Sequence, residues 1–141
     1  MWTISATAHT SAPASRVWAI YCDVANWPRW DHGMARYQPA GPFATGTSGT
    51  LQAVGGPELP FTIMLVEEGR SFVDRTPIGP ENAIIGRHEL TPLPEGTQIT
   101  HTVEIDGPNA EHLAQEIGFA QEELYDTVSN LARYAEEDRH D

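Results

Sequence analysis

The sequence has little cysteine, little positive charge and no long apolar run. Its one cysteine, Cys22, excludes an internal disulfide, so we expect a chain that does not depend on an oxidising compartment, which favours the cytoplasm. Only 8 Lys and Arg residues stand against 20 Asp and Glu, for a formal net charge of −12. Such an acidic chain is a poor partner for nucleic acid. No stretch approaches the roughly 20 apolar residues that span a bilayer, so no membrane insertion is expected.

Several recognisable site motifs are also missing from the sequence. It contains no Gly-rich phosphate loop, no G-x-S-x-G nucleophile motif, no Cys/His metal spacing and no dinucleotide fingerprint. We therefore predict neither a cofactor nor a metal. Cys22 lies on an apolar helical stretch, which predicts a buried structural side chain rather than a nucleophile. A chain of 141 residues is expected to form one domain, 1–141.

A long amphipathic helix is predicted at the C-terminal end, over residues 110–137. Its apolar residues recur in steps of three and four, which is typical of one helical stripe. They are Leu113, Ile117, Ala120, Leu124, Val128, Leu131 and Ala135. A helix of about 27 residues is about 40 Å long, so this stripe needs a broad apolar partner surface.

The partner surface is predicted to be a sheet of seven strands. Residues 2–10 alternate between apolar and polar side chains, as in a half-buried strand. Six further strands are expected, joined by short Gly- and Pro-containing turns that make neighbours antiparallel. They cover residues 35–39, 47–54, 59–67, 70–77, 82–92 and 97–106. Two short helices come between the first and second strands, with Ser11 as the expected N-cap and a break at Pro28.

Two histidines are predicted to face each other on the inner face of this sheet. Alternation in 97–106 places His101 inward, between Ile99 and Val103. Alternation in 82–92 places His88 inward in the same way. If Pro94-Glu95 forms the hairpin tip, His88 and His101 are directly opposed, with Cβ atoms about 4.5–5.5 Å apart.

A carboxylate is expected beside this histidine pair. If Phe72 points inward, Asp74 does so too, and the next hairpin brings it near His88. Such a cluster suits general acid/base chemistry, because a neutral histidine shuttles protons near pH 7 and a carboxylate orients it. A structural alternative is that each histidine is a hydrogen-bonded wall residue. A divalent metal held by the three groups is a third alternative, although the usual ligand spacing is absent.

The order of elements and several motifs resemble a known superfamily. The motifs are APASRVW at 12–18, DVANWPRW at 23–30, GTQIT at 96–100 and Gly107-Pro108 before the last helix. They resemble the Bet v 1-like or START-like (SRPBCC) superfamily, with the polyketide cyclase/dehydrase-like proteins as the nearest branch. The resemblance implies an α+β helix-grip fold, with a curved seven-stranded antiparallel sheet around the C-terminal helix. It also implies an internal cavity for an apolar or aromatic small molecule.

The resemblance implies that the inward-facing polar and aromatic side chains form a site around the cavity. His88, His101 and Asp74 become candidate catalytic residues. The candidate substrate-binding residues are aromatic: Trp30, Phe61, Phe72, Phe119 and Tyr125. Most aromatic residues in such a chain belong to the core, so each of these has a structural alternative.

Three functions stay open on the sequence. The first is a cyclase, aromatase or dehydratase acting on a polyketide-like substrate. The second is a non-catalytic binder or carrier of a lipid or hydrophobic metabolite, and the third is a partner-binding module. The expected partner is a hydrophobic small molecule, and the sequence leaves a homodimer open.

Overall fold

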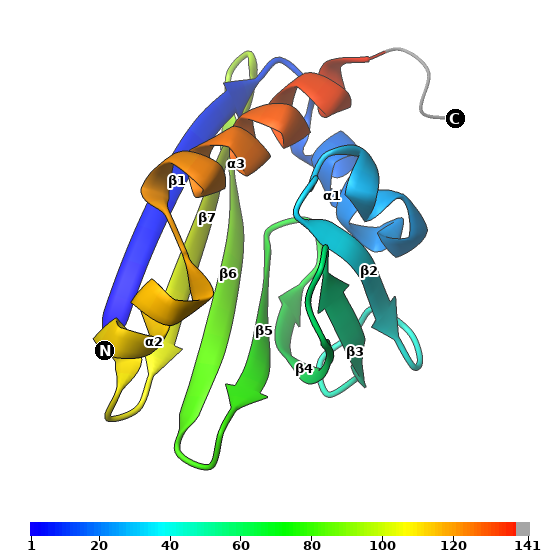
Figure 1. Ribbon diagram of the computed structural model, residues 1–141. Coiled ribbons are helices and arrows are strands. Elements are labelled where there is room, and N and C mark those ends of the chain that lie inside the picture. Colours follow the sequence, from blue (N-terminus) through cyan, green and yellow to red (C-terminus); the bar gives the residue numbers. More distant parts are fainter. Residues whose placement is uncertain (138–141) are drawn as a thin grey trace.

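The computed structural model of the protein describes residues 1–137. Seven strands form one antiparallel sheet in the order β1-β7-β6-β5-β4-β3-β2. The strands are β1 Trp2–Thr10, β2 Met34–Pro39, β3 Ser48–Ala53, β4 Glu58–Glu67, β5 Ser71–Ile78, β6 Asn82–Leu93 and β7 Gly96–Asp106. The helices are α1 Ala14–Cys22, the 3₁₀ helix η1 Val24–Arg29, α2 Ala110–Ile117 and α3 Gln121–Glu136. The curved sheet wraps around α3, which crosses its concave face (Figure 1).

The predicted strands and their register are confirmed. Each strand begins and ends within one residue of its predicted position. In the β6–β7 hairpin, His88 pairs with His101, Gly86 with Val103 and Leu90 with Ile99. Alternation predicted the shared face, because a slip of one residue would turn the apolar face of both strands toward water, and the hairpin tip at Pro94-Glu95 predicted the exact pairing.

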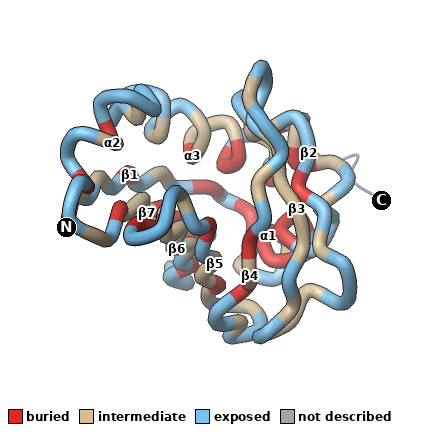
Figure 2. Tube along the Cα trace, turned by 60° about the horizontal axis from the view of Figure 1, so that its bottom comes forward, coloured by how far each residue is buried: buried red, intermediate tan, exposed pale blue. Residues whose placement is uncertain are grey.

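The interior is divided into two apolar clusters of unequal size. The larger one joins the inner faces of α1 and α3 to the sheet, and Figure 2 shows buried positions gathering where these helices meet it. Val17 and Tyr21 of α1 and Val128 and Leu131 of α3 are fully buried in it. The smaller cluster lies under α2, where Ala110 and Ala114 pack against Ile105 of β7.

The prediction of one continuous C-terminal helix was wrong. Gly118 adopts a left-handed conformation with φ of +85° and caps α2, and Ala120 is extended before α3 begins. Glycine reaches this conformation without the clash that a side chain would cause. As a result Ile117, expected in the apolar stripe, is 45% exposed. The spacing rule missed the break because apolar side chains continue on both sides of it.

Three smaller predictions were also wrong. Cys22 is exposed, because it is the last residue of α1 and lies off the buried face. Ser11 does not cap α1, whose N-cap is Pro13; the Ser11 amide instead donates to Glu136 (2.8 Å). The break between the short helices falls at Asp23, and Pro28 lies inside η1. Within residues 1–137, no helix is both long and apolar enough to cross a membrane.

Candidate functional site

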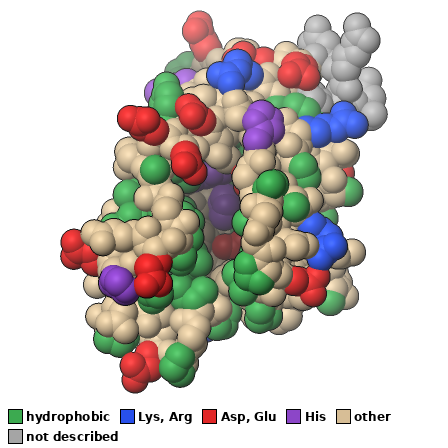
Figure 3. Space-filling view, in the orientation of Figure 1, with side chains coloured by type: hydrophobic (Ala, Val, Ile, Leu, Met, Phe, Trp, Pro, Cys, Tyr) green, Lys and Arg blue, Asp and Glu red, His purple; other side chains and the backbone are tan. Residues whose placement is uncertain are grey.

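The concave face of the sheet is hollowed below α3. Figure 3 shows this hollow between the α2 side and the β2–β4 side of the molecule, with histidine and acidic side chains on its floor. The inward-facing polar residues at the centre of the sheet are His101 of β7, His88 of β6 and Asp74 of β5. His88 and Asp74 are partly buried, whereas His101 is only 4% exposed. His88 and Asp74 are therefore the members of the group that a molecule in the hollow can reach.

The two histidines form a chain of contacts that ends on α1. Their rings meet edge to face, with centroids 4.7 Å apart. The Tyr21 hydroxyl lies 2.7 Å from His101 Nε2, within hydrogen-bond distance. On the other side, the His88 ring stacks on Phe72 at 3.9 Å, and His88 Nδ1 donates to the Phe72 carbonyl (3.3 Å). Because a carbonyl only accepts, this contact places the proton on Nδ1 and leaves a lone pair on Nε2 of the neutral ring.

The carboxylate of Asp74 is held by Tyr37 and sits against Gly86. The Tyr37 hydroxyl, on β2, donates to Asp74 Oδ2 at 2.8 Å. Asp74 pairs with Gly86 across the β5–β6 ladder. A Cβ at Gly86 would lie 2.6 Å from Asp74 Oδ1 and 3.2 Å from His88 Cε1, so the missing side chain makes room for both groups. Glycine at 86 thus allows the carboxylate and the imidazole to share one end of the hollow.

Burial moves the pKa values of these groups in opposite directions. It lowers the pKa of His88 to about 4 and that of His101 well below its usual value, with the neighbouring His88 adding to the effect on His101. Burial raises the pKa of Asp74 to about 6, against the lowering effect of the Tyr37 hydrogen bond and of the Gly86 amide. At neutral pH both imidazoles are therefore uncharged, and Asp74 is a carboxylate poised close to its pKa.

The predicted aromatic residues are not gathered around one space. Trp30 and Phe72 are buried beside the Tyr21 ring, and Phe61 is buried against Tyr37, with ring centroids 4.3 Å apart. Phe119 stacks on Trp2 in the smaller cluster. Tyr125 is 54% exposed on α3, away from the histidine pair.

Sequence reasoning missed two participants, Tyr21 and Tyr37. Both side chains are buried, and each places its hydroxyl on a member of the predicted cluster. The signal was present, since a buried tyrosine generally needs a hydrogen-bond partner that phenylalanine would not. Their partners lie on strands distant in sequence, so the pairing itself was not predictable.

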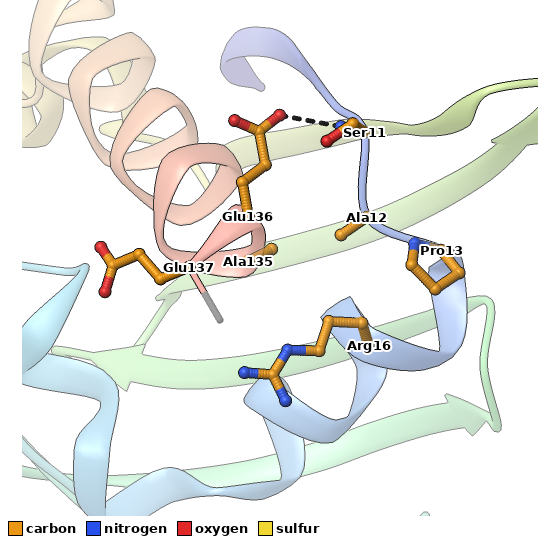
Figure 4. Close-up of a pocket in the computed structure, with 7 residues that line it drawn as sticks. All are labelled: Ser11, Ala12, Pro13, Arg16, Ala135, Glu136 and Glu137. Carbon is orange, nitrogen blue, oxygen red and sulfur yellow. Dashed lines mark hydrogen bonds between the residues drawn. The ribbon is translucent and has the colours of Figure 1, made fainter. Parts of the chain in front are cut away.

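Two further pockets open on the outside of α3. The larger, of about 350 Å³, is lined by Ser11, Arg16, Glu136 and their neighbours. Figure 4 shows the Glu136 carboxylate reaching the Ser11 amide, which ties the end of α3 to the β1–α1 connection. A smaller pocket of about 250 Å³ lies beside Tyr125. Among residues 1–137, no three His, Cys, Asp or Glu side chains gather closely enough to hold a metal ion.

Solved structures of similar shape cover nearly the whole chain. A protein from Mesorhizobium loti superposes with a TM-score of 0.74 at 17% identity, covering 99% of both chains. Norcoclaurine synthase from Thalictrum flavum, in complex with dopamine and hydroxybenzaldehyde, gives 0.73 at 14% identity, over 99% of this chain and 89% of that one. DynU16, a putative protein of the dynemicin biosynthetic locus, gives 0.71 at 23% identity, over 95% of this chain and 47% of that one.

Identities this low establish the fold and nothing more. A match to a family model also establishes the family. No curated protein matches the sequence. The model of the family described as "Polyketide cyclase / dehydrase and lipid transport" matches residues 1–136. Ara h 8.0201 is also similar in shape, with a TM-score of 0.67 at 13% identity, over 95% of this chain and 97% of that one. The chain therefore belongs to the polyketide cyclase / dehydrase and lipid transport family.

Proposed function

We propose that the protein binds an apolar, aromatic small molecule in the hollow and catalyses the cyclisation or dehydration of a polyketide-like substrate. The observation that carries this proposal is Asp74. It is a carboxylate on the floor of the hollow, held by Tyr37, with its pKa raised to about 6 by burial. A base with a pKa near the working pH is the most effective proton acceptor, and such a base contributes about 10²–10⁴-fold to a rate.

The roles proposed for the residues follow from their charge states. Asp74 takes a proton from the carbon between two carbonyl groups, so that the C–H bond breaks and an enolate forms. The enolate carbon attacks a third, more distant carbonyl of the same molecule, and a C–C bond forms as the C=O π bond breaks. Asp74 then returns the proton to the new alkoxide oxygen. His88, neutral near pH 7, presents its Nε2 lone pair to a substrate hydroxyl and orients it. This exchanges the roles expected from the sequence, which gave proton transfer to the histidines and orientation to the carboxylate.

The family and its neighbours support this class of substrate. The family description names cyclases, dehydrases and lipid transport. Norcoclaurine synthase was solved with two aromatic molecules, and DynU16 comes from a biosynthetic locus. An acidic protein with few cations is also better suited to a neutral guest than to an anionic one.

The test uses 1-phenylbutane-1,3-dione, an aromatic β-diketone, in deuterated buffer. We expect the protein to accelerate exchange of the central C–H protons, followed by NMR, with a rate that rises as pH passes through about 6. Asp74→Asn should lose at least about 100-fold of the protein-dependent rate. Asp126→Asn, an equal change of charge on the exposed face of α3, is the matched control and should keep it. Equal rates for the two variants would refute Asp74 as the base.

A carrier of a lipid or hydrophobic metabolite is the second candidate. It is favoured by the neutral state of both histidines, which keeps the hollow free of positive charge. A carrier would bind 1-phenylbutane-1,3-dione, measured by calorimetry, without accelerating exchange. The same pair of measurements therefore separates an enzyme from a carrier.

A further inference from the structure

One buried polar atom close to the site has no partner. Among the buried side-chain nitrogen and oxygen atoms of residues 1–137, only Trp30 Nε1 makes no hydrogen bond, although Trp30 is just 1% exposed. The neighbouring donors are matched. Trp27 Nε1 donates to the Tyr21 carbonyl at 2.9 Å, and the Tyr21 hydroxyl is engaged with His101. Folded proteins rarely leave a buried donor unpaired, so this atom needs an explanation.

Trp30 belongs to the ring cluster directly behind the hollow. Its ring lies 6.1 Å from Tyr21 and 6.2 Å from His101, measured between centroids. His101 in turn contacts His88, which is only partly buried. Trp30 therefore packs against a tyrosine ring and a histidine ring that belong to the proposed site.

The rings that pack against Trp30 offer a water molecule few hydrogen-bond partners. A buried water makes about three hydrogen bonds to polar groups. The rings around Trp30 are those of Tyr21, Trp27 and His101, and the Tyr21 hydroxyl is already used. An indole N–H can only donate, so its partner must be an acceptor. One acceptor oxygen on an otherwise apolar molecule satisfies the donor and places the remaining surface of that molecule against aromatic rings.

We propose that Trp30 Nε1 donates a hydrogen bond to a carbonyl or phenolate oxygen of the bound molecule, and so selects aromatic ketones and phenols over plain hydrocarbons. This inference rests on the proposed function, because it concerns the same guest. Because Trp30 is only 1% exposed, contact between the bound molecule and the indole requires neighbouring residues to move. The turn after Trp30 is joined to α3 by a 3.5 Å contact between His32 and Asn130, at the limit of hydrogen-bond distance.

Two matched probes test the selection: 2-acetylnaphthalene, which has a carbonyl oxygen, and 2-ethylnaphthalene, which has a methylene group in its place. By calorimetry, we expect the protein to bind the acetyl compound about 2- to 10-fold more tightly, the range of one net hydrogen bond. Trp30→Phe keeps the aromatic body and removes the N–H, so the preference should disappear while 2-ethylnaphthalene binds as before. Trp27→Phe is the control, since its N–H is already paired, and it should keep the preference.

The outcomes distinguish failure of the Trp30 inference from failure of the proposed function. If neither probe binds, both proposals fail. If both bind and Trp30→Phe keeps the preference, the Trp30 inference fails and the proposed function stands. Stability gives a second measurement. Both substitutions remove buried ring volume, but only Trp27→Phe also breaks a hydrogen bond, so Trp27→Phe should lower the melting temperature more than Trp30→Phe does.

A measurement on the unmodified protein guards against misfolded variants. With ¹⁵N-labelled tryptophan, each indole N–H gives its own NMR signal. Addition of 2-acetylnaphthalene should shift the Trp30 signal downfield, as a new hydrogen bond does, and 2-ethylnaphthalene should not. Equal shifts with the two probes would overturn the proposal.

Discussion

At the scale of single residues, the site depends on a side chain that is missing. Gly86 lies between Asp74 and His88, and both groups occupy the space where its Cβ would be. The Asp74 carboxylate is fixed from the other side by Tyr37, so it has little freedom to move away. The position of Gly86 is therefore set by packing, since its backbone is an ordinary part of the β6 ladder.

Gly86→Ala should consequently damage both stability and function. We expect a loss of about 1–3 kcal/mol in the free energy of unfolding, the usual cost of overpacking, measured by urea denaturation. Exchange of 1-phenylbutane-1,3-dione should fall at least about tenfold, because the carboxylate is displaced from Tyr37.

Gly33→Ala is the matched control for this change. A Cβ there meets only Asp31 Oδ1, at an ordinary 3.8 Å. It should be neutral or slightly stabilising. Equal stability of the two alanine variants would show that the space at Gly86 is not filled as described.

At the scale of elements, the break between α2 and α3 lets the two helices pack on different apolar clusters. Three non-helical residues, 118–120, separate the two helices. α3 stays on the larger cluster, and Gln121 at its start donates to the Ser5 carbonyl of β1. α2 rests on the smaller cluster with Phe119 stacked on Trp2. The two helices are therefore held by different contacts.

The left-handed conformation of Gly118 makes this break testable. Gly118→Ala should lower the free energy of unfolding by about 1 kcal/mol, because a Cβ is strained at φ of +85°. Gly118→Asn should cost less, since asparagine tolerates this conformation. Thermal denaturation of the two variants checks the order, and an alanine variant more stable than the asparagine one would contradict it.

The strands were predictable and the helix break was not, for one physical reason. Along β6 and β7, burial of one face forces a strict alternation that placed both histidines inward, and the short hairpin at Pro94-Glu95 placed His88 opposite His101. In the C-terminal segment, local conformation at Gly118 outweighed an apolar spacing that allowed a continuous helix. The hydroxyl partners Tyr21 and Tyr37 depended on contacts between distant segments, which no local pattern contains.

At the scale of the whole molecule, buried ionisable groups make stability depend on pH in two opposing ways. The pKa values of Asp74 and Asp31 are raised to about 6, chiefly by burial, so the folded state keeps protons that the unfolded state loses above about pH 4. Their contribution to stability therefore falls as pH rises from about 4 to 6. The lowered pKa values of His88 and His101 have the opposite effect. Below about pH 6.5 the unfolded state binds protons that the folded state does not, so this loss of stability shrinks as pH rises toward that value.

Two variants separate these opposing contributions. Relative to the unmodified protein, the free energy of unfolding of Asp74→Asn should rise by on the order of 2 kcal/mol between pH 4.5 and pH 7. The free energy of unfolding of His88→Gln, relative to the unmodified protein, should fall over the same interval. Urea denaturation at the two pH values measures both, and differences that share a sign would contradict the assignment.

The unequal division of the interior has a practical consequence for redesign. Most of the large buried side chains lie in the cluster under α1 and α3, whereas α2 contributes two alanines to a small one. Exchanging residues under α2 therefore puts little of the folding energy at risk. Substitutions under α2 are therefore the first choice for making room for bulkier molecules, because the larger cluster under α1 and α3 is left unchanged.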